Sequence, residues 1–257
     1  MKPVVVIIVQ ARMSSTRLPG KVLMDIEGKP MLQHIIERLK TCRNADRIVV
    51  ATSDSAQDRA IVELAERCGA GSYAGSLEDV LDRYYQAAKK YGADVVVRIT
   101  ADCPVIDPEL VDRVIKEYLD HKDSYDYVSL GTPNRYPDGL DTELVSFKAL
   151  EKAWKEAKLA SEREHVMPYI WKNPTIFRIG GVPAENDLSF LRWTVDEDRD
   201  LRFIREVYRA LYHDGRIFTT ADILDLLSER PELLKINQDI TRNEGYLKSL
   251  REDKIVK

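Results

Sequence analysis

The chain has 257 residues, a net charge of −4 and an apolar fraction of 44%, values typical of a globular protein with a substantial core. The slight negative charge does not favour a non-specific nucleic-acid binder or a basic membrane-surface protein, so any polyanion must be held by a local cluster of cations. Three widely spaced cysteines form neither a disulfide framework nor a zinc motif, so we expect a cytoplasmic protein. No stretch approaches the ~20 apolar residues that span a bilayer, so we expect no membrane segment.

The first half of the chain alternates predicted strands and helices. Continuous apolar runs predict strands buried on both faces at residues 4–9, 47–52 and 94–100. Amphipathic helices are predicted at residues 30–40, after a Ser55 cap, after a Ser76 cap, and at residues 108–119, where Asp107 is the expected cap. This alternation predicts a mainly parallel sheet with helices on both faces, which is a three-layer α/β/α arrangement.

The pattern changes after about residue 125. Strands are predicted at residues 126–130, 140–145, 177–182 and 191–195, and helices at residues 147–159, 161–171 and 201–212, followed from residue 219 by a helical tail that Pro231 interrupts. With no internal repeat and no long linker, we expect one domain over residues 1–257. Within it we distinguish an amino-terminal half at about 1–125, a middle subregion at about 126–190 and a C-terminal helical tail at about 214–257.

A cationic loop follows the first predicted strand. Arg12, Arg17 and Lys21 lie among hydroxyl residues in the stretch QARMSSTRLPGK. Ligands of open α/β sheets bind in the crevice outside the carboxyl ends of the strands, where this loop begins. Three cations there indicate a bound anion, with backbone N–H groups and hydroxyls as further donors; solvated surface charge is the alternative. A Walker P-loop is excluded, because Ser15 replaces its first glycine and Val22 its hydroxyl residue.

Six motifs, in order along the chain, resemble a known family. QARMSSTRLPGKVL resembles the phosphate-binding loop of the sugar-acid cytidylyltransferases, and most of all their spore coat polysaccharide biosynthesis branch. The resemblance implies a Rossmann-like nucleotide-diphospho-sugar transferase fold with a mixed, mainly parallel sheet, in which the amino-terminal half binds the nucleotide and the middle subregion serves the acceptor and dimerisation. The further motifs are GSLEDVLDRY, RITADCPVIDPELVD, DGLDTELVS, REHVMPYI and LRWTVDEDRDL.

The resemblance also implies individual site residues. Arg12, Arg17 and Lys21 would hold the triphosphate of CTP and, together with Asp102, form the catalytic set. Asp102 and Asp196 would bind Mg²⁺, with Asp198 as a helper. The nucleotide would further be contacted by residues of the loop and of the middle of the amino-terminal half, namely Ala11, Ser14, Ser15, Ser76, Arg83, Thr100 and Ala101.

Position along the chain independently supports the two metal ligands. Asp102 and Asp196 each follow a predicted core strand, so both carboxylates are expected at the crevice that holds the cationic loop. Mg²⁺ takes hard oxygen ligands, usually one or two carboxylates plus phosphate oxygens. The alternative is that each aspartate merely caps a helix. The expected reaction is attack of an acceptor oxygen on the α-phosphorus of CTP, with release of pyrophosphate.

Acceptor recognition is expected in the stretches DGLDTELVS and SEREHV. Arg163 could bind a substrate carboxylate or phosphate as a fork, and His165 could donate a hydrogen bond or shuttle a proton. A structural histidine and a helix-surface ion pair are the alternative interpretation. Cys103, beside Pro104, is interpreted as a buried thiol and not as a nucleophile. The predicted substrate-binding set is Asp141, Glu143, Arg163, Glu164 and His165.

The sequence therefore predicts a cytoplasmic, Mg²⁺-dependent cytidylyltransferase that makes a CMP-activated sugar acid or polyol for surface polysaccharide. We expect a homodimer that binds neither nucleic acid nor membrane. Gln10 and the stretch VDEDRD differ from the sialate and octulosonate enzymes, and these differences concern the sugar and not the phosphates. Two alternatives stay open: a glycosyltransferase of the same architecture with a nucleotide-sugar donor, and a non-catalytic nucleotide-binding partner in polysaccharide assembly.

Overall fold

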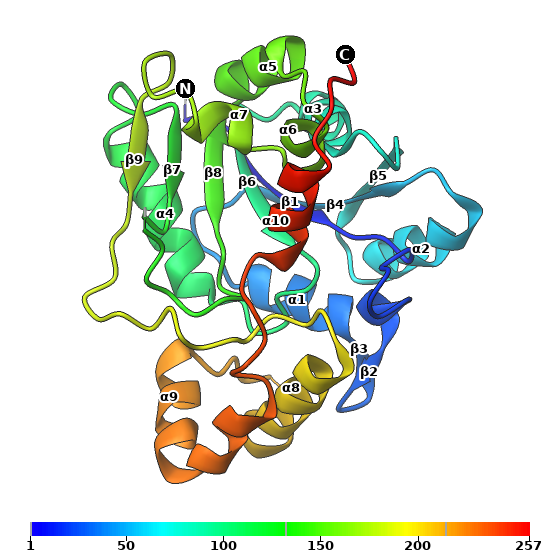
Figure 1. The fold of residues 1–257 in the computed structure, drawn as a ribbon, viewed down its shortest axis with the longest axis vertical. Helices are drawn as coiled ribbons and strands as arrows, with labels where there is room; N and C mark the ends of the chain where they lie inside the picture. The colour runs from blue at the N-terminus through cyan, green and yellow to red at the C-terminus, as the bar shows by residue number, and fades with distance from the viewer. Residues whose placement is uncertain (1, 132, 214) are drawn as a thin grey trace.

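Among the residues that the structure describes, seven strands form the main sheet. The computed structural model describes residues 2–131, 133–213 and 215–257, and its strands are ordered β5-β4-β1-β6-β8-β7-β9 (Figure 1). Only β8 runs antiparallel to its two neighbours, so the predicted mixed, mainly parallel sheet is confirmed. The bounds are Val5–Gln10 (β1), Arg47–Ser53 (β4), Gly71–Gly75 (β5), Val95–Thr100 (β6), Tyr127–Ser129 (β7), Glu143–Ser146 (β8) and Ile179–Gly181 (β9).

Helices cover both faces of this sheet. A small hairpin of β2 (Asp25–Ile26) and β3 (Lys29–Pro30) and three short 3-10 helices at Lys21–Leu23, Ala56–Asp58 and Pro231–Ile236 complete the described elements. The α-helices are α1 (Met31–Leu39), α2 (Arg59–Arg67), α3 (Val80–Lys90), α4 (Pro108–Asp120), α5 (Phe147–Glu156), α6 (Ala160–His165), α7 (Pro168–Trp171), α8 (Asp198–Leu211), α9 (Thr220–Glu229) and α10 (Glu244–Arg251).

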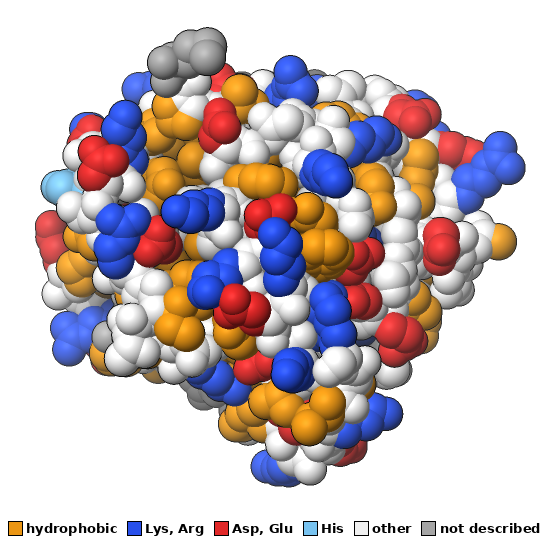
Figure 2. All heavy atoms as spheres, turned by 90° about the horizontal axis from the view of Figure 1, so that it is seen from above, with side chains coloured by type: hydrophobic (Ala, Val, Ile, Leu, Met, Phe, Trp, Pro, Cys, Tyr) orange, Lys and Arg blue, Asp and Glu red, His pale blue; other side chains and the backbone are white. Residues whose placement is uncertain are grey.

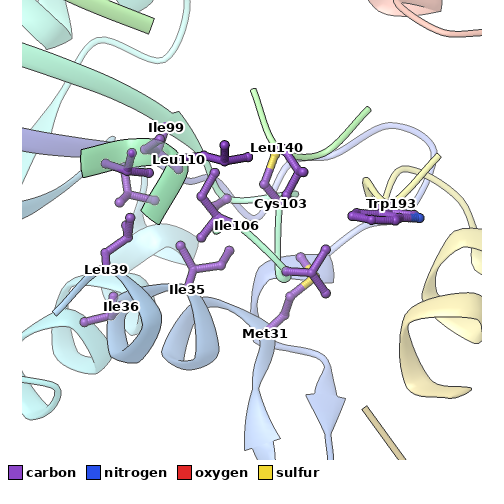
Figure 3. Close-up of a cluster of buried hydrophobic side chains, with 14 of the residues drawn as sticks. Met31, Ile35, Ile36, Leu39, Ile99, Cys103, Ile106, Leu110, Leu140 and Trp193 are labelled. Carbon is purple, nitrogen blue, oxygen red and sulfur yellow. The ribbon is translucent and has the colours of Figure 1, made fainter. Parts of the chain in front are cut away.

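Strand β1 divides the apolar core into two layers. Successive side chains of a strand point to opposite faces, so Ile7 packs with the layer under α1 and α4, while Ile8 packs with the layer under α3 and α5. Figure 3 shows the first layer, in which Ile35 of α1 lies near Ile106 and below the thiol of Cys103. Since both faces of β1 are buried, its run of aliphatic residues is explained and the three-layer prediction is confirmed.

Two of the predicted helix starts differ from the structure. Asp107 caps α4 as expected and accepts from Glu109 N at 2.9 Å. Ser76 does not cap the next predicted helix: α3 begins only at Val80, and its cap is Asp79. The carboxylate of Asp79 accepts a hydrogen bond from Asp82 N in the first turn at 2.9 Å. The hydroxyl of Ser76 lies before the helix and accepts from Asp79 N at 3.0 Å. Ser55 makes no side-chain cap bond.

The predicted strand at residues 191–195 is wrong. This segment is extended but belongs to no strand, and it pairs with the turn at Asp138 and Gly139 through the bond from Trp193 N to Asp138 O and a bond from Asp138 N to Leu191 O. Its backbone also reaches the end of β6, where Val195 N donates to Asp102 O at 2.8 Å. The predicted helix at residues 161–171 is likewise divided into α6 and α7, because Val166 adopts a φ of 72° between them.

The C-terminal segment returns to the sheet after a separate helical layer. The predicted start of the tail, residue 214, lies outside the described residues; α9 and the 3-10 helix at Pro231–Ile236 pack with α8, below the sheet in Figure 1. Helix α10 then crosses in front of the central strands and contacts α6. None of the described helices is long and apolar enough to cross a bilayer. Figure 2, a view from above, shows basic and acidic side chains interspersed on that face.

Candidate active site

A buried ammonium group lies at the centre of the predicted site. Lys21, only 8% exposed, is the last cation of the cationic loop and the first residue of the 3-10 helix at Lys21–Leu23. Its Nζ lies 3.3 Å from Asp102 Oδ2 and 2.9 Å from Asp196 Oδ1, and it donates to Val195 O at 2.7 Å. The predicted convergence of the cationic loop with two carboxylates distant in the chain is therefore confirmed, while their roles in binding stay predictions.

Lys21 and Asp102 stabilise each other's charge. Burial alone would raise the pKa of Asp102, but the Lys21 ammonium and a hydrogen bond from Thr100 outweigh it and hold the pKa below its ordinary value. Burial lowers the pKa of Lys21, yet Asp102 and Asp196 together raise it above its ordinary value. Both groups are therefore ionised at neutral pH. Thr100, the last residue of β6, contributes through its hydroxyl, which donates to Asp102 Oδ1.

Asp196 is held by two further cations. Arg17 Nη2 lies 3.0 Å and Arg192 Nη2 3.3 Å from its Oδ2. The guanidinium of Arg192 is in turn held by the fully buried Asp200, at 2.9 Å from each carboxylate oxygen. Asp200 also accepts from Asn237 Nδ2 at 2.9 Å and from the backbone N of Asp196 at 3.0 Å. Arg192 and Asp200 were not predicted as site residues, although both lie in the stretch LRWTVDEDRD.

The cationic loop is fixed at its base and leaves Arg12 available. Buried Asp58 accepts from Met13 N at 2.8 Å and from Thr52 Oγ1 at 3.0 Å, which ties the loop to the end of β4. Gly20 has a φ of 72° and donates to Met13 O at 2.9 Å, which closes the loop. Arg12 makes no hydrogen bond or ion pair with residues 2–131, 133–213 and 215–257. A free guanidinium beside an ordered loop fits an anion ligand.

The other predicted nucleotide contacts have mixed surroundings. Arg83 is 1% exposed and donates to Ser76 O at 2.8 Å, while its Nε finds no partner in the described chain. Burial, with Arg12 as a nearby like charge, lowers the pKa of Arg83. Ala11 N and Ala101 N donate to the backbone of neighbouring strands, at 3.1 and 3.0 Å. Ser15 Oγ accepts from Leu18 N at 3.4 Å, and Ser14 is half-buried.

Two of the three predicted acidic acceptor contacts, Asp141 and Glu143, lie in different networks. Asp141 lies 3.1 Å from Arg242 Nη2, and neighbouring Asp138 lies 2.9 Å from Arg192 Nη1, so both border the charged cluster. Burial and the Asp141 carboxylate raise the pKa of Asp138 to about 7, against the effect of Arg242 and Arg192. Glu143 lies on β8, where its two oxygens are bound by Arg98 and Tyr127 at 2.6 Å.

Arg163 has structural partners in place of a substrate. It is buried, and its Nε and Nη2 both bind Asp79 Oδ2, at 2.8 and 2.6 Å. Its Nη1 donates to the carbonyls of Trp154 and Ala157. The side chain thus joins the start of α3 to the segment between α5 and α6, and a substrate would have to break these bonds. We therefore assign it this structural role, which corresponds to the ion-pair alternative.

His165 is neutral and bound to the C-terminal helix. Burial, together with the charges of Arg98 and Arg12, lowers its pKa to about 4, although Glu164 opposes this. Its Nε2 lies 3.0 Å from Ser249 Oγ of α10, and the same hydroxyl donates to Glu164 Oε2 at 2.8 Å. A neutral imidazole can exchange a hydrogen bond with a ligand but does not carry a positive charge at pH 7.

The carboxylates fit a divalent cation only together with ligand oxygens. Residues 2–131, 133–213 and 215–257 contain no group of three or more His, Cys, Asp or Glu side chains placed to hold a metal. Asp102 and Asp196 nevertheless share one cation, the Lys21 ammonium, and Mg²⁺ is usually bound by one or two carboxylates plus phosphate oxygens and waters. Two surface hollows, one around Glu37 and Cys68 and one around Asp25 and Arg205, are lined by residues that do not belong to this charged cluster.

The arrangement defines a class of protein before any comparison. A mainly parallel sheet carries cations and two carboxylates at the carboxyl ends of β1 and β6, which is where doubly wound folds bind phosphorylated ligands. The fold and the cluster thus define a nucleotide-binding α/β protein. The model of the cytidylyltransferase family matches residues 6–233, so the chain belongs to the cytidylyltransferase family and is a nucleotidyltransferase.

Three known proteins extend this finding. The spore coat polysaccharide biosynthesis protein SpsF of Bacillus subtilis is 29% identical over 89% of this chain and 95% of its own length. A 3-deoxy-manno-octulosonate cytidylyltransferase of Geobacter sulfurreducens is 39% identical over 42% of each chain. The solved structure of a cytidylyltransferase from Leptospira borgpetersenii superposes with a TM-score of 0.87 at 31% identity, over 94% of this chain and 98% of that one. The resemblance stated from the sequence motifs is confirmed.

Proposed function

We propose that this enzyme transfers CMP from CTP to a sugar acid or related polyol, with release of pyrophosphate, for surface polysaccharide synthesis. The observation that carries the proposal is the contact of Lys21 Nζ with Asp102 and Asp196 at the end of the sheet. The names of the Geobacter and Bacillus relatives, an octulosonate cytidylyltransferase and a spore coat polysaccharide protein, support the acceptor class and the polymer. The homodimer and the cytoplasmic location stay predictions.

The cations of the loop bind and orient the triphosphate in this proposal. Arg12 has no partner among the residues that the structure describes, and Arg17 lies partly exposed at the rim of the cluster. Lys21 lies deeper and offsets the negative charge that builds up on phosphate oxygens during transfer. Asp102 and Asp196 would hold Mg²⁺, which supplies Lewis-acid charge neutralisation when it is bound. Arg192 positions Asp196 by contacting the oxygen that Lys21 leaves free.

No side-chain nucleophile is required for this reaction. An acceptor oxygen attacks the α-phosphorus, the bond to the bridging oxygen breaks, and pyrophosphate departs with that electron pair. Cys103 is 2% exposed, and burial with the adjacent Asp102 carboxylate raises its pKa well above the ordinary value, so it stays a thiol. Catalysis then depends on alignment of CTP and acceptor and on electrostatic stabilisation.

The experiment compares Asp102→Asn with Asp225→Asn as a matched control, because Asp225 is an exposed aspartate of α9 with no proposed role in the site. We expect Asp102→Asn to lower pyrophosphate release from CTP by ~100-fold or more, a loss typical of removing one electrostatic group from an active site. CTP affinity should be partly retained, since the loop cations are unchanged, and Asp225→Asn should keep most of its turnover. Normal turnover of Asp102→Asn would contradict the metal assignment.

The glycosyltransferase alternative is tested with ligands alone. Thermal-shift measurements with CTP, UTP, CMP and a UDP-sugar, each with and without Mg²⁺, should show the largest stabilisation by CTP with Mg²⁺. Greater stabilisation by the UDP-sugar would favour the glycosyltransferase. Membership of the cytidylyltransferase family already argues against the non-catalytic alternative.

A further inference from the structure

The last residues of the chain cross the charged cluster as a strap, which we define as residues 242–257. At its start, Arg242 donates to Tyr136 O at 3.0 Å and lies 3.1 Å from Asp141. At its far end, Asp253 accepts from the backbone N and the hydroxyl of Ser161, at 3.0 and 2.7 Å. Figure 1 shows α10 between these ends, in front of the central strands. The strap therefore extends from the acidic border of the site to α6.

A glutamate near the start of the strap forms an ion pair with an arginine of the cationic loop. Glu244, the first residue of α10, lies 3.1 Å from Arg17 Nη1 through Oε2. The other side of the same guanidinium contacts Asp196. Arg17 is thus shared by two carboxylates, and an incoming phosphate group must compete with the carboxylate of Glu244 for its donors. One helical turn further on, Ser249 bonds to His165 and Glu164 of the predicted acceptor set.

The strap is held mainly by polar contacts, and its one aromatic anchor is Tyr246 of α10, which packs edge-on against His165 and Trp171. Helix α10 contains no buried residue, and Leu247 and Leu250 stay 42% and 38% exposed. Hydrogen bonds and ion pairs at a surface exchange with water at little net cost, whereas a helix with a buried apolar face would lose hydrophobic stabilisation on release. The construction therefore permits α10 to detach, while the backbone bonds from Ala160 N to Lys254 O and from Val256 N to Lys158 O keep the end of the strap in place and the two core layers stay intact.

We propose that the strap is a gate that competes with the triphosphate, and that Glu244 lowers the affinity of the site for polyphosphate by pairing with Arg17. Binding of the triphosphate displaces Glu244 and releases α10 from the cluster. This inference rests on the proposed function only in taking Arg17 as a phosphate-binding residue. It makes Glu244 a determinant of substrate affinity that acts without touching the reacting atoms.

The first test measures affinity for inorganic tripolyphosphate by calorimetry. We compare Glu244→Gln with Glu252→Gln, a control on the same strap whose exposed side chain forms no ion pair within the described residues. Loss of one surface ion pair should strengthen tripolyphosphate binding about two- to five-fold in Glu244→Gln, while Glu252→Gln binds as the natural protein does. The KM for CTP should fall by a similar factor with kcat unchanged. Unchanged or weaker binding by Glu244→Gln would overturn the proposal.

The second test follows the strap itself by amide hydrogen exchange. Saturating tripolyphosphate should increase exchange in residues 244–251 of the natural protein, because the ligand releases the helix. Slower exchange there would mean that the strap clamps onto the ligand, and it would overturn the competition. Neither test depends on turnover. If Glu244→Gln strengthens tripolyphosphate binding but the protein does not consume CTP, the proposed function alone is contradicted. If the protein consumes CTP but Glu244→Gln leaves tripolyphosphate binding unchanged, the strap proposal alone is contradicted.

Discussion

At the scale of single residues, Asp138 has a charge state that depends strongly on its surroundings. It interacts with the like charges of Asp141 and Asp102 and with the opposite charges of Arg242 and Arg192. Burial and the two like charges prevail, and the pKa rises to about 7 from an ordinary value near 4. The protonated form is therefore favoured by the fold and disfavoured by unfolding.

The raised pKa of Asp138 predicts a pH-dependent stability. Since the native state binds the proton more tightly, the group contributes stability that is present below about pH 4 and is lost as the pH rises to about 7. Asp138→Asn removes this titration. The free energy of unfolding of the natural protein minus that of the variant should therefore fall between pH 5 and pH 7, by at most ~1.4 kcal/mol per pH unit, and level off above that range. Urea unfolding at several pH values measures it, and a constant difference would refute it.

Some site residues can be predicted from a short stretch of sequence, whereas the contacts of others form only in the folded chain. Arg12, Arg17 and Lys21 lie in one short loop after a strand, so their location at the carboxyl end of β1 followed from order along the chain. Asp102 followed in the same way from the end of β6. The partner of Arg163 could not be read from its own stretch, because Asp79 reaches it only in the folded chain. Glu244 gave no local signal, since nothing in its own stretch indicates that it meets Arg17.

At the scale of elements, strands buried on both faces were predicted well, whereas β5 was not predicted and the strand predicted at residues 191–195 was wrong. The strands β1, β4 and β6 have continuous aliphatic runs, which indicate burial without knowledge of partners. The stretch GSYAG has no such run and becomes β5 only through its parallel register with β4. Residues 191–195 have a strand-like composition, yet their backbone pairs with the turn at Asp138 and Gly139 and not with another strand.

The close contact at Gly139 predicts a local and costly mutation. Its φ is 107°, and a Cβ there would lie 2.5 Å from Thr194 N and 2.6 Å from Trp193 C, which are backbone atoms that cannot rotate away. Gly139→Ala should therefore push aside the segment that carries Asp196. Gly92→Ala is the control, because Gly92 also has a positive φ, of 63°, but meets nothing within 4 Å. That control should cost ~1–3 kcal/mol from backbone strain alone.

We expect Gly139→Ala to lose at least ~2 kcal/mol more of the free energy of unfolding than the control, as large losses follow overpacking combined with strain. Its kcat for pyrophosphate release should also fall, while that of Gly92→Ala should not. Chemical denaturation and steady-state kinetics on both variants provide the measurement. Equal losses of stability and activity would mean that the chain at residues 138–140 moves freely away from residues 193–194.

At the scale of the whole molecule, one buried arginine joins the sheet layer to the C-terminal helices. Arg38 of α1 donates through Nε to Ile106 O at 2.7 Å and through Nη2 to Phe218 O at 2.6 Å. Its guanidinium also lies 4.5 Å from the ring centroid of Phe218. Phe218 precedes α9, so the contact fixes the start of that helical layer against α1 and the loop after β6.

Arg38→Met should destabilise the protein without altering the chemistry of the folded form. It leaves the carbonyls of Ile106 and Phe218 unsatisfied in the interior, at ~1–3 kcal/mol for each. For a chain of this length a loss of ~3 kcal/mol lowers the Tm by about 6–12 °C. The exposed Arg43→Met is the control and should shift the Tm by a degree or two at most. Scanning calorimetry tests both; equal Tm values would show that Arg38 contributes nothing to the layer contact.

By itself the sequence determined the α/β class, the buried central strands, the position of the cationic loop and the family, because aliphatic runs, caps and short motifs are local patterns that survive without coordinates. The tertiary structure decided which distant charges meet: Lys21 between Asp102 and Asp196, Arg192 on Asp200, and the strap over Arg17. Such pairs form between residues far apart in the chain, where Coulomb interaction depends on distance in space and on burial, and neither quantity is written in the order of residues.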